Sequence, residues 1–386
     1  MRYRKFGKTG LEVSALGFGC MRLPLVNLDA KIGVDDGAID EPKATELLRW
    51  AIDNGVNYVD TAYPYHLGNS ELFVGRALQD GYRQKVRLAT KLPSWLIQSR
   101  GDMDRYLDEQ LKKLQTDSID FYLVHTVNRL FWPNLVENGL FEFLDSALSD
   151  GRIRFAGFSF HDELDMFREA LDAYPWSFCQ IQYNFLDENY QAGKEGLQLA
   201  VDRGLGVVIM EPLRGGRLAS NIPPAAQKLW DGAPVRRSPA EWALRYLWDY
   251  PGISVVLSGM NEMAQVAENV RIARETLPNS MTEADRKLIN DVREVYNAMK
   301  KIDCTGCRYC MPCPSGVNIP ACFTLFNNTV MLDDALHHRI FYRVQIGSDH
   351  KASNCVECGE CEKACPQHIP IRAALKEVAA LLEAQD

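Results

Sequence analysis

The sequence predicts an α/β protein in which a (β/α)8 TIM barrel is followed by a small, mostly α-helical, cysteine-rich domain. Between residues 15 and 275, short apolar runs alternate with amphipathic segments, and this unit of roughly thirty residues repeats eight times. Near the C-terminus, eight of the 11 cysteines fall in two tight runs. A chain of 386 residues can bury one large core and carry a small appendage, so two domains are expected.

The predicted strands are the apolar runs that open each unit. They span residues 15–20, 57–62, 86–92, 119–124, 153–158, 178–183, 206–210 and 253–257. Eight parallel units close most economically into a barrel, because a closed sheet leaves no edge unpaired. The alternative is an open, doubly wound sheet, which usually carries a G-x-G-x-x-G turn after its first strand. Residues 17–22 read GFGCMR and lack the third glycine.

Helices are predicted between the strands. Residues 43–54 place apolar side chains at helical spacing, and Gly55 stands where a C-terminal cap glycine is expected, as do Gly151 and Gly204. Residues 2–14 are expected to form a hairpin that covers the bottom of the barrel. A helix over 282–301 leads into the cysteine-rich region, so the predicted domains are 1–300 and 301–386.

The two cysteine runs indicate iron–sulfur ligation. Each ends in a proline, Pro314 or Pro366, and the second run has the C-x-x-C-x-x-C-x-x-x-C-P spacing of bacterial ferredoxins. In two-cluster ferredoxins the fourth cysteine of each run binds the other cluster. The expected ligands of two 4Fe-4S clusters are therefore Cys304, Cys307, Cys310 and Cys365 for one, and Cys355, Cys358, Cys361 and Cys313 for the other. The long, helix-like segment 315–354 resembles an α-helical ferredoxin rather than the compact hairpin type.

Zinc and disulfides are the alternatives for these cysteines. Structural zinc sites usually use two separated C-x-x-C knuckles rather than four cysteines in a row. Disulfides belong to an oxidising compartment, yet the sequence opens MRYRK without an apolar signal segment. The other cysteines, Cys20, Cys179 and Cys322, lie in apolar contexts and are expected in the core.

The charge and the apolar content of the sequence limit the kinds of partner that the protein can bind. The net charge of -8 argues against nucleic acid or an anionic membrane surface, because both reward clustered Lys and Arg. No apolar run approaches the length that spans a bilayer. A cytoplasmic location is expected, since thiolates and clusters survive there.

Four polar residues lie at the ends of predicted strands. Asp60 lies near the end of the second strand and Tyr65 just beyond it, Lys91 lies at the end of the third, and His125 lies at the end of the fourth. In a (β/α)8 barrel the chemistry lies where the strands end, so a carboxylate, a phenol, an ammonium and an imidazole should share one mouth.

This constellation resembles the aldo/keto reductase family, whose catalytic tetrad of Asp, Tyr, Lys and His falls on Asp60, Tyr65, Lys91 and His125. Further sequence motifs match the family in the same order along the chain: VDTA at 59–62, GNSE at 68–71, GRIR at 151–154 and AEN at 267–269. The resemblance covers residues 1–275 and implies interconversion of a carbonyl and an alcohol with NAD or NADP. With the cysteines added, the chain resembles the branch of that family with a C-terminal ferredoxin-like domain.

Hydride reduction of a carbonyl needs a proton donor at the oxygen. Tyr65 is the expected donor, with its pKa lowered by Lys91, which Asp60 would hold; His125 would orient the carbonyl. Tyr63 is expected to line the pocket instead. The other predicted pocket walls are Trp95, the 126–133 loop with Phe131 and Trp132, and the 214–238 loop; they suggest an apolar or ring-bearing carbonyl substrate.

The resemblance also implies cofactor contacts. Ser159 and Gln182 would hold the nicotinamide carboxamide; Pro212, Leu213 and Gly215 would follow the pyrophosphate; Gly259, Gln265, Glu268 and Asn269 would meet the adenosine. The sequence departs from the family pattern in two places. Phe160 stands where the family usually has Asn, and Asn261 and Glu262 stand where Arg or Lys usually meets the 2′-phosphate. NADH is therefore at least as plausible as NADPH, unless Arg214 or Arg217 reaches in.

Three functions remain open. The first is a nicotinamide-dependent reductase or dehydrogenase with structural or regulatory clusters. The second is an enzyme whose clusters pass electrons to or from a redox protein partner, which needs a one-electron cofactor such as a flavin. The third is a nicotinamide-binding redox sensor. The intact tetrad favours an enzyme.

Overall fold

The computed structural model describes residues 1–26, 38–220, 222–333 and 335–384. These residues form two compact units. The first comprises Met1–Ser220 and Arg237–Arg286; the second comprises Asn221–Arg236 and Lys287–Asp386. The predicted boundary near residue 300 stays a prediction, and most of the preceding helix packs with the second unit.

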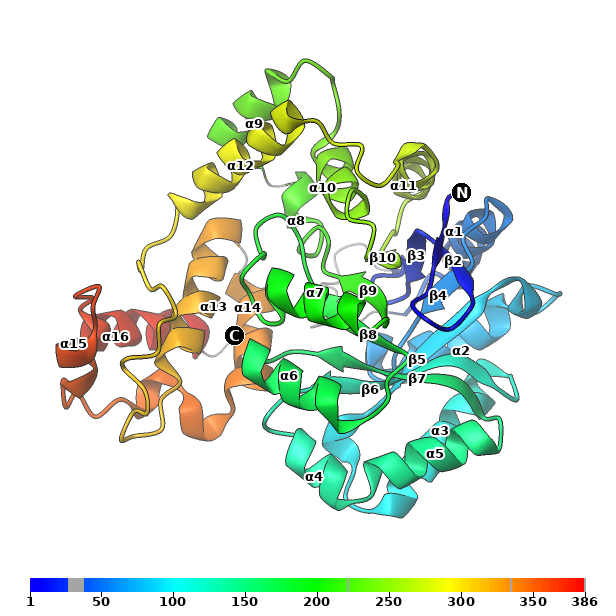
Figure 1. Cartoon of the computed structure of the whole chain (residues 1–386), viewed down its shortest axis with the longest axis horizontal. Helices are drawn as coiled ribbons and strands as arrows, with labels where there is room; N and C mark the ends of the chain where they lie inside the picture. Colours follow the sequence, from blue (N-terminus) through cyan, green and yellow to red (C-terminus); the bar gives the residue numbers. More distant parts are fainter. Residues whose placement is uncertain (27–37, 221, 334, 385–386) are drawn as a thin grey trace. The chain divides into compact units, whose positions relative to one another are not determined.

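Among the described residues of the first unit, eight parallel strands close a barrel in the order β10-β3-β4-β5-β6-β7-β8-β9 (Figure 1). The strands are β3 (Leu16–Gly19), β4 (Tyr58–Asp60), β5 (Arg87–Leu92), β6 (Ile119–Val127), β7 (Ile153–Phe160), β8 (Phe178–Gln182), β9 (Gly206–Met210) and β10 (Val255–Ser258). All eight strands predicted from the sequence are present, and the closed barrel is confirmed.

The N-terminal end of the barrel is closed by aromatic side chains. The short antiparallel strands β1 (Tyr3–Lys5) and β2 (Glu12–Ser14) form the predicted hairpin. Phe6, between them, packs its ring 4.4 to 6.1 Å from the rings of Tyr58, Phe121 and Phe178 inside the barrel. A Cβ at Gly157 would lie 2.5 Å from the Phe178 ring, so glycine leaves the space that this ring fills. The opposite end of the barrel is left for polar groups.

Helices surround these strands (Figure 1). Those of the first unit include α1 (Glu41–Asp53), α2 (Asn69–Ala77), α3 (Arg100–Leu114), α4 (Trp132–Glu137), α5 (Leu140–Ser149), α6 (Leu164–Ala173), α7 (Gly193–Asp202), α8 (Arg217–Ser220), α10 (Pro239–Trp248) and α11 (Met263–Glu275). Asp40 caps α1 by accepting the Lys43 N–H at 3.2 Å. The predicted cap glycines adopt left-handed backbone just beyond their helices, as Gly55 shows with φ 97°.

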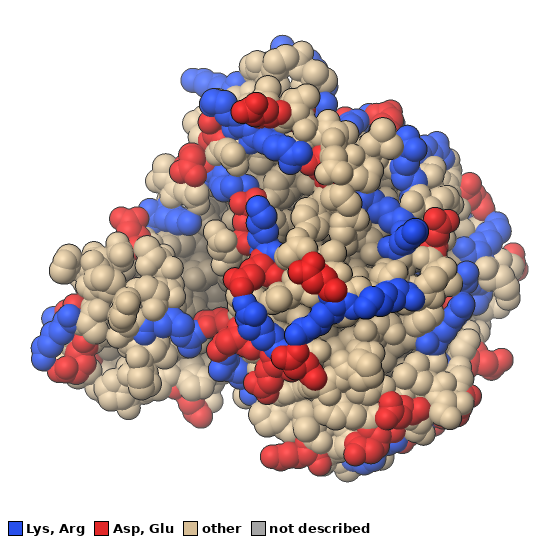
Figure 2. Space-filling model, viewed as in Figure 1, with Lys and Arg blue, Asp and Glu red and all other residues tan. Residues whose placement is uncertain are grey.

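The surface of the chain mixes both signs of charge. Figure 2 shows Lys and Arg interspersed with Asp and Glu over the visible face. Arg152, for example, pairs with Asp104, Asp108 and Asp150. No helix within the described ranges is long and apolar enough to cross a membrane.

The second unit is helical. It holds α9 (Pro224–Asp231), most of α12 (Glu283–Asn297), α13 (Ile319–Leu332), α14 (Ala335–Ile346), α15 (Glu360–Ala364) and α16 (Ile371–Leu382). Phe323, Phe326, Leu375 and Val378 lie in one buried cluster between α13 and α16. Asn327 fixes the chain before the first cysteine, because its Oδ1 accepts the N–H groups of residues 301 and 302 at 3.1 Å. A small helical core therefore supports both cysteine runs.

Candidate functional site

The four predicted catalytic side chains meet at the C-terminal mouth of the barrel. Asp60 ends β4 and Lys91 lies on β5, both almost completely buried. Lys91 Nζ donates to Asp60 Oδ1 at 2.7 Å, to the Thr61 carbonyl at 2.8 Å and to Tyr65 OH at 3.3 Å. The three bonds use all three ammonium protons. The lysine is therefore fixed between the carboxylate and the phenol.

Tyr65 and His125 complete this group. Tyr65 opens the short 3-10 helix η1 (Tyr65–Gly68), and its ring lies 6.2 Å from the His125 ring at 82°. His125 lies on β6, which loses regular pairing with β7 between Val124 and Val127. Thr126 there adopts φ 57°, so the strand bends directly after the imidazole. Such irregularities are common beside active sites, where they re-aim a side chain.

Burial dominates the ionisation of the tetrad. Burial raises the pKa of Asp60, and the Lys91 charge opposes that shift. Burial also lowers the pKa of Lys91, but Asp60 and Tyr65 outweigh it, so the net pKa rises and the ammonium persists. Burial raises the pKa of Tyr65 more than Lys91 lowers it. The predicted net lowering of the pKa of Tyr65 is therefore wrong, although the Lys91 ammonium acts in the predicted direction.

His125 is held as a neutral imidazole. Burial, followed by the charge of Lys91, lowers its pKa well below the usual value. Its Nδ1 is buried without a hydrogen-bond partner, while the Ser94 hydroxyl donates to its backbone carbonyl. The Trp95 ring lies 5.3 Å from the imidazole. Trp95 is therefore beside the tetrad, as a pocket wall should be.

Two predicted pocket residues lie elsewhere. Tyr63 faces α3, where its OH donates to Glu109 at 3.3 Å and its ring packs 5.2 Å from that of Tyr106. Trp132 is buried in the core beside Phe141, with ring centres 6.1 Å apart. The expectation that these two side chains line the pocket is wrong, because both pack against helices instead.

Polar side chains on β7 and β8 extend the site around the mouth of the barrel. Ser159 pairs in register with Gln180, and its Oγ accepts the Thr126 N–H at 2.8 Å. Gln180 is buried, and its side-chain oxygen has no partner. Gln182 instead donates its amide to Asp187 at 3.0 Å. The side chain beside Ser159 with an unpartnered acceptor oxygen is therefore that of Gln180. The sequence points to Gln182 and not to Gln180, although the two residues lie two apart on β8 and so face the same side of the strand.

The packing of Phe160, the residue after Ser159, explains one of the departures from the family pattern. Phe160 is fully buried, and its ring packs 4.9 Å from that of Phe167 on α6. His161 follows it, and burial lowers its pKa to about 4. The residue in the place of the usual asparagine thus belongs to the core.

The segments after β9 and β10 hold the other predicted cofactor residues. Pro212, Leu213 and Gly215 follow β9, and Gly215 has φ 64°. Nearby, Arg214 is buried and forms an ion pair with Asp187, so it is not available to a 2′-phosphate. Gly259 follows β10.

The remaining predicted contacts lie on α11. Gln265 accepts the Asn261 N–H at 3.0 Å, Glu268 accepts the Ser238 hydroxyl at 2.7 Å, and the buried Asn269 donates to Ser258 at 3.1 Å. Glu262, just before the helix, pairs with Lys43 at 2.6 Å. Lys43 of α1 therefore adds a positive charge beside Glu262, where the sequence indicated only an acidic residue.

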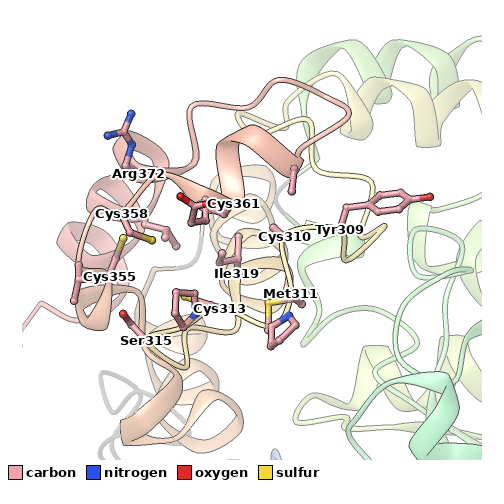
Figure 3. Close-up of a pocket in the computed structure, with 17 residues that line it drawn as sticks. Tyr309, Cys310, Met311, Cys313, Ser315, Ile319, Cys355, Cys358, Cys361 and Arg372 are labelled. Atoms are coloured by element: carbon pink, nitrogen blue, oxygen red, sulfur yellow. The ribbon is translucent and has the colours of Figure 1, made fainter.

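In the second unit, the cysteines gather around two cavities. Cys313 joins Cys355, Cys358 and Cys361 around a cavity of about 190 Å³, where Figure 3 shows them beside Ile319. The other cavity is lined by Cys304, Cys307 and Cys365, and Cys310 borders both. Each fourth cysteine thus lies with the run to which it does not belong.

The two runs share one backbone conformation. Gly306 and Glu357, two residues after the first cysteine of each run, have φ 71° and 58°, and Arg308 and Gly359 have φ 65° and 81°. Gly306 N–H and Glu357 N–H each donate to the sulfur of that first cysteine at 3.4 Å. Left-handed backbone at non-glycine residues is unfavourable, so its repetition indicates that both loops wrap the same kind of group.

The cysteine sets fit iron–sulfur clusters. Within the described ranges, no group of three or more His, Cys, Asp or Glu side chains converges closely enough to hold one metal ion. Four thiols spread around a cavity suit a cubane, which offers a separate iron to each thiolate.

Comparison with known proteins settles the family. The model of the aldo/keto reductase family matches residues 15–290. The chain belongs to this family. A second family model, the 4Fe-4S dicluster domain, matches residues 303–369. The protein is therefore an oxidoreductase of the aldo/keto reductase family that carries a 4Fe-4S dicluster domain.

Relatives support this assignment for the barrel. The chain is 28% identical to the aldo-keto reductase YhdN of Bacillus subtilis over 76% of its own length and 94% of that protein. It is 31% identical to the uncharacterized oxidoreductase YrpG of the same organism over 56% of its length and 68% of YrpG. Among solved structures, the holo form of aldo-keto reductase AKR11C1 from Bacillus halodurans matches with a TM-score of 0.62, at 28% identity, over 76% of this chain and 96% of that one.

Proposed function

We propose that this aldo/keto reductase interconverts a small-molecule carbonyl and an alcohol by hydride transfer with NADH or NADPH. The observation that carries the proposal is the Lys91 ammonium, which bonds Asp60 on one side and Tyr65 on the other at the barrel mouth. The His125 ring lies 6.2 Å from the Tyr65 ring and 5.3 Å from the Trp95 ring, so a carbonyl compound bound to this phenol would lie beside both. The bound nicotinamide would supply the hydride.

Tyr65 donates the proton to the developing alkoxide. Its raised pKa keeps the phenol protonated at neutral pH, which a proton donor requires. Lys91 then stabilises the phenolate that remains, since its ammonium already lies 3.3 Å from the oxygen. Asp60 keeps that ammonium charged and oriented. In the reverse direction, the same phenolate takes the proton from the alcohol.

His125 orients the carbonyl oxygen. A neutral imidazole offers one N–H donor, and its low pKa excludes a second positive charge next to Lys91. Burial of the site strengthens such a hydrogen bond, because the local dielectric is low.

The nicotinamide carboxamide would lie against Ser159 and Gln180. Gln180 has a buried acceptor without a partner, and an amide NH2 of the cofactor can satisfy it. Gln182 supports the site indirectly through Asp187. Pro212, Leu213 and Gly215 would follow the pyrophosphate, and Gly259, Gln265, Glu268 and Asn269 would meet the adenosine.

Two 4Fe-4S clusters are part of the proposal. Cys304, Cys307, Cys310 and Cys365 would bind one cluster, and Cys355, Cys358, Cys361 and Cys313 the other. A cytoplasmic location suits both the thiolates and the nicotinamide cofactor. The clusters would supply one-electron chemistry to the second unit when they are bound.

A second candidate function is electron exchange with a redox protein. Cys307 and Cys358, the second cysteine of each run, are solvent-exposed. A cluster bound there would reach the surface, where a partner can approach it. This reading needs a one-electron acceptor in the barrel as well.

One experiment separates these functions. Anaerobically purified protein is offered a panel of apolar and ring-bearing carbonyl compounds with NADH, NADPH or reduced ferredoxin as the electron source. Turnover with a nicotinamide alone supports the first function. Turnover that requires reduced ferredoxin supports the second, and the absence of turnover with nicotinamides contradicts the first.

A further inference from the structure

We propose that Glu71 and Gln110 are positioning residues for the reaction, because they hold the backbone of Lys91 from the face of β5 opposite to its side chain. The Lys91 ammonium is thereby fixed against the Tyr65 phenol. The inference rests on the proposed carbonyl reduction, and it adds two residues that act through Lys91 rather than on the substrate. Glu71 closes the GNSE motif at 68–71, which the tetrad leaves without a role.

Gln110 on α3 binds the main chain of Lys91 directly. Its Nε2 donates to the Lys91 carbonyl at 3.0 Å and to Glu71 Oε1 at 2.6 Å, with a longer contact of 3.3 Å to Thr90 Oγ1. Its side-chain oxygen accepts the Tyr122 hydroxyl at 2.8 Å. All five residues are completely buried. Because a carbonyl can only accept, the amide nitrogen has to face Lys91, and the orientation of Gln110 is fixed.

Glu71 on α2 holds Gln110 in that orientation. Its Oε1 accepts the Gln110 amide and also the Thr90 hydroxyl, the latter at 2.7 Å. Thr90 precedes Lys91 on β5, so its side chain lies on the other face of the strand from the ammonium. Among the described residues Oε2 has no hydrogen-bond partner, and it lies 3.8 Å from Lys113 Nζ. One oxygen of Glu71 therefore gathers two donors behind Lys91.

The residue before Glu71 supports the ammonium itself. Ser70 Oγ lies 2.8 Å from Thr61 Oγ1, and the Thr61 carbonyl accepts from Lys91 Nζ at 2.8 Å. Ser70 and Glu71 lie in the first turn of α2, which begins directly after the 3-10 helix η1 that Tyr65 opens. This turn is thus linked to both the carbonyl and the ammonium of Lys91. It therefore helps to set the 3.3 Å distance between the ammonium and the Tyr65 oxygen.

A buried carboxylate is costly, so Glu71 does more than fill space. Burial raises its pKa, and the hydrogen bonds from Thr90 and Gln110, followed by the charge of Lys113, oppose that shift. An apolar side chain of similar size would avoid this cost. Position matters at such a site, because a displacement of about 1 Å caused far from the chemistry can cost about 100-fold in rate.

The test measures kcat, KM and the pH dependence of alcohol oxidation by the full chain. Glu71→Leu and Gln110→Met should each lower kcat about ten-fold or more, while KM and the dissociation constant of the dinucleotide stay within about two-fold. The Lys91 charge lowers the pKa of Tyr65, so a displaced ammonium should raise the apparent pKa of the oxidation profile by about 0.5 or more. Glu71→Gln keeps an acceptor oxygen and should stay close to native in both measurements.

Asp120→Leu is the matched control. Asp120 is also a buried carboxylate that binds β5, since its Oδ2 accepts the Leu88 N–H at 3.0 Å, but it lies at the N-terminal end of the barrel. Its loss should lower the temperature of thermal unfolding without moving the pH profile. Thr90→Val changes the side chain least and removes one donor to Glu71. It should shift the profile upward by a smaller amount, which tests the inference even if Glu71→Leu does not fold.

The outcomes separate the inference from the proposed function. If the native protein neither oxidises alcohols nor reduces carbonyl compounds, both fail. If the native protein is active and Glu71→Leu and Gln110→Met keep its kcat and pH profile, only the positioning role is overturned. An equal shift of the profile in Asp120→Leu would show a general loss of stability and would also overturn it. Equal losses in Glu71→Gln and Glu71→Leu would show that the charge of Glu71 acts instead of its acceptor oxygen, and the inference would be wrong.

Discussion

Lys91 and Asp60 form a buried ion pair, with Nζ 2.7 Å from Oδ1, at the mouth of the barrel. Both side chains are almost completely covered, with 0% and 3% of their side-chain surface exposed. A charge pair in that position is costly to break from one side, because the remaining charge stays buried and unpaired. The pair therefore sets both the stability of the mouth and the electrostatics of Tyr65.

Removing one partner of this pair should cost more stability than removing both. Lys91→Met leaves Asp60 buried without its cation and should lower the free energy of unfolding by about 3–5 kcal/mol. Lys91→Met combined with Asp60→Asn should recover much of that loss, because no uncompensated charge remains. Denaturant unfolding of the single and double variants measures the difference. Strictly additive losses in the free energy of unfolding would contradict the account. Neither the single nor the double variant should show carbonyl reduction.

Two neutral histidines at the mouth should make the barrel sensitive to acid. Unfolded histidine has a pKa near 6.5, whereas burial lowers the pKa of His161 to about 4 and that of His125 well below its usual value. Below pH about 6.5 the unfolded chain binds more protons than the folded one. His161 should then reduce the free energy of unfolding by about 1.4 kcal/mol per pH unit as the pH falls to about 4, and His125 acts in the same direction.

His161→Gln tests this contribution. The variant should lose stability less steeply than the native protein between pH 6.5 and 4, and the two should follow parallel curves above pH 7. Denaturant unfolding at a series of pH values measures both slopes. Equal slopes in the acid range would show that His161 is not held neutral.

Cofactor choice should depend on the pair between Glu262 and Lys43. The carboxylate of Glu262 repels a 2′-phosphate and occupies the ammonium of Lys43 at 2.6 Å. Glu262→Gln should therefore shift the ratio of kcat/KM for NADPH over NADH upward by several-fold. Lys43→Met should shift the ratio the other way. A ratio that neither variant changes would place the adenosine elsewhere.

The two clusters can be removed without touching the barrel tetrad. Cys307→Ser and Cys358→Ser each remove one proposed ligand, and each should bleach part of the brown colour of anaerobically purified protein. Iron and sulfide analysis counts the clusters. If carbonyl reduction by a nicotinamide survives in both variants, electrons for that reaction do not pass through the clusters. Zinc in the native protein, with no visible absorption, would contradict the cluster assignment.

Much of the barrel follows from periodicity alone. The eight apolar runs mark β3 to β10, because strands buried on both faces need continuous apolar side chains. Three of the four tetrad residues can also be located from the sequence, because polar residues near the end of an apolar run lie near the C-terminal end of a strand. Asp60 is the last residue of β4, Lys91 lies one residue before the end of β5, and His125 lies two residues before the end of β6.

Other features depend on distances that a sequence does not contain. Tyr63 lies against α3 because the segment after β4 is irregular, and alternation cannot orient its ring. Gln180 and Gln182 have the same parity along β8, so the sequence cannot tell that Gln182 donates to Asp187 while the side-chain oxygen of Gln180 has no partner. The raised pKa of Tyr65 reflects the depth of its burial, which exceeds the effect of the lysine charge.

The most direct test of the account compares carbonyl reduction by Tyr65→Phe and Tyr63→Phe, two variants that each lose one phenol oxygen two residues apart. Steady-state turnover with the preferred nicotinamide is measured for both, alongside their thermal unfolding. We expect Tyr65→Phe to lose at least about 100-fold in kcat while remaining folded, and Tyr63→Phe to stay within a few-fold of the native rate. Native-like turnover in Tyr65→Phe would contradict the assignment of Tyr65 as the proton donor held by Lys91.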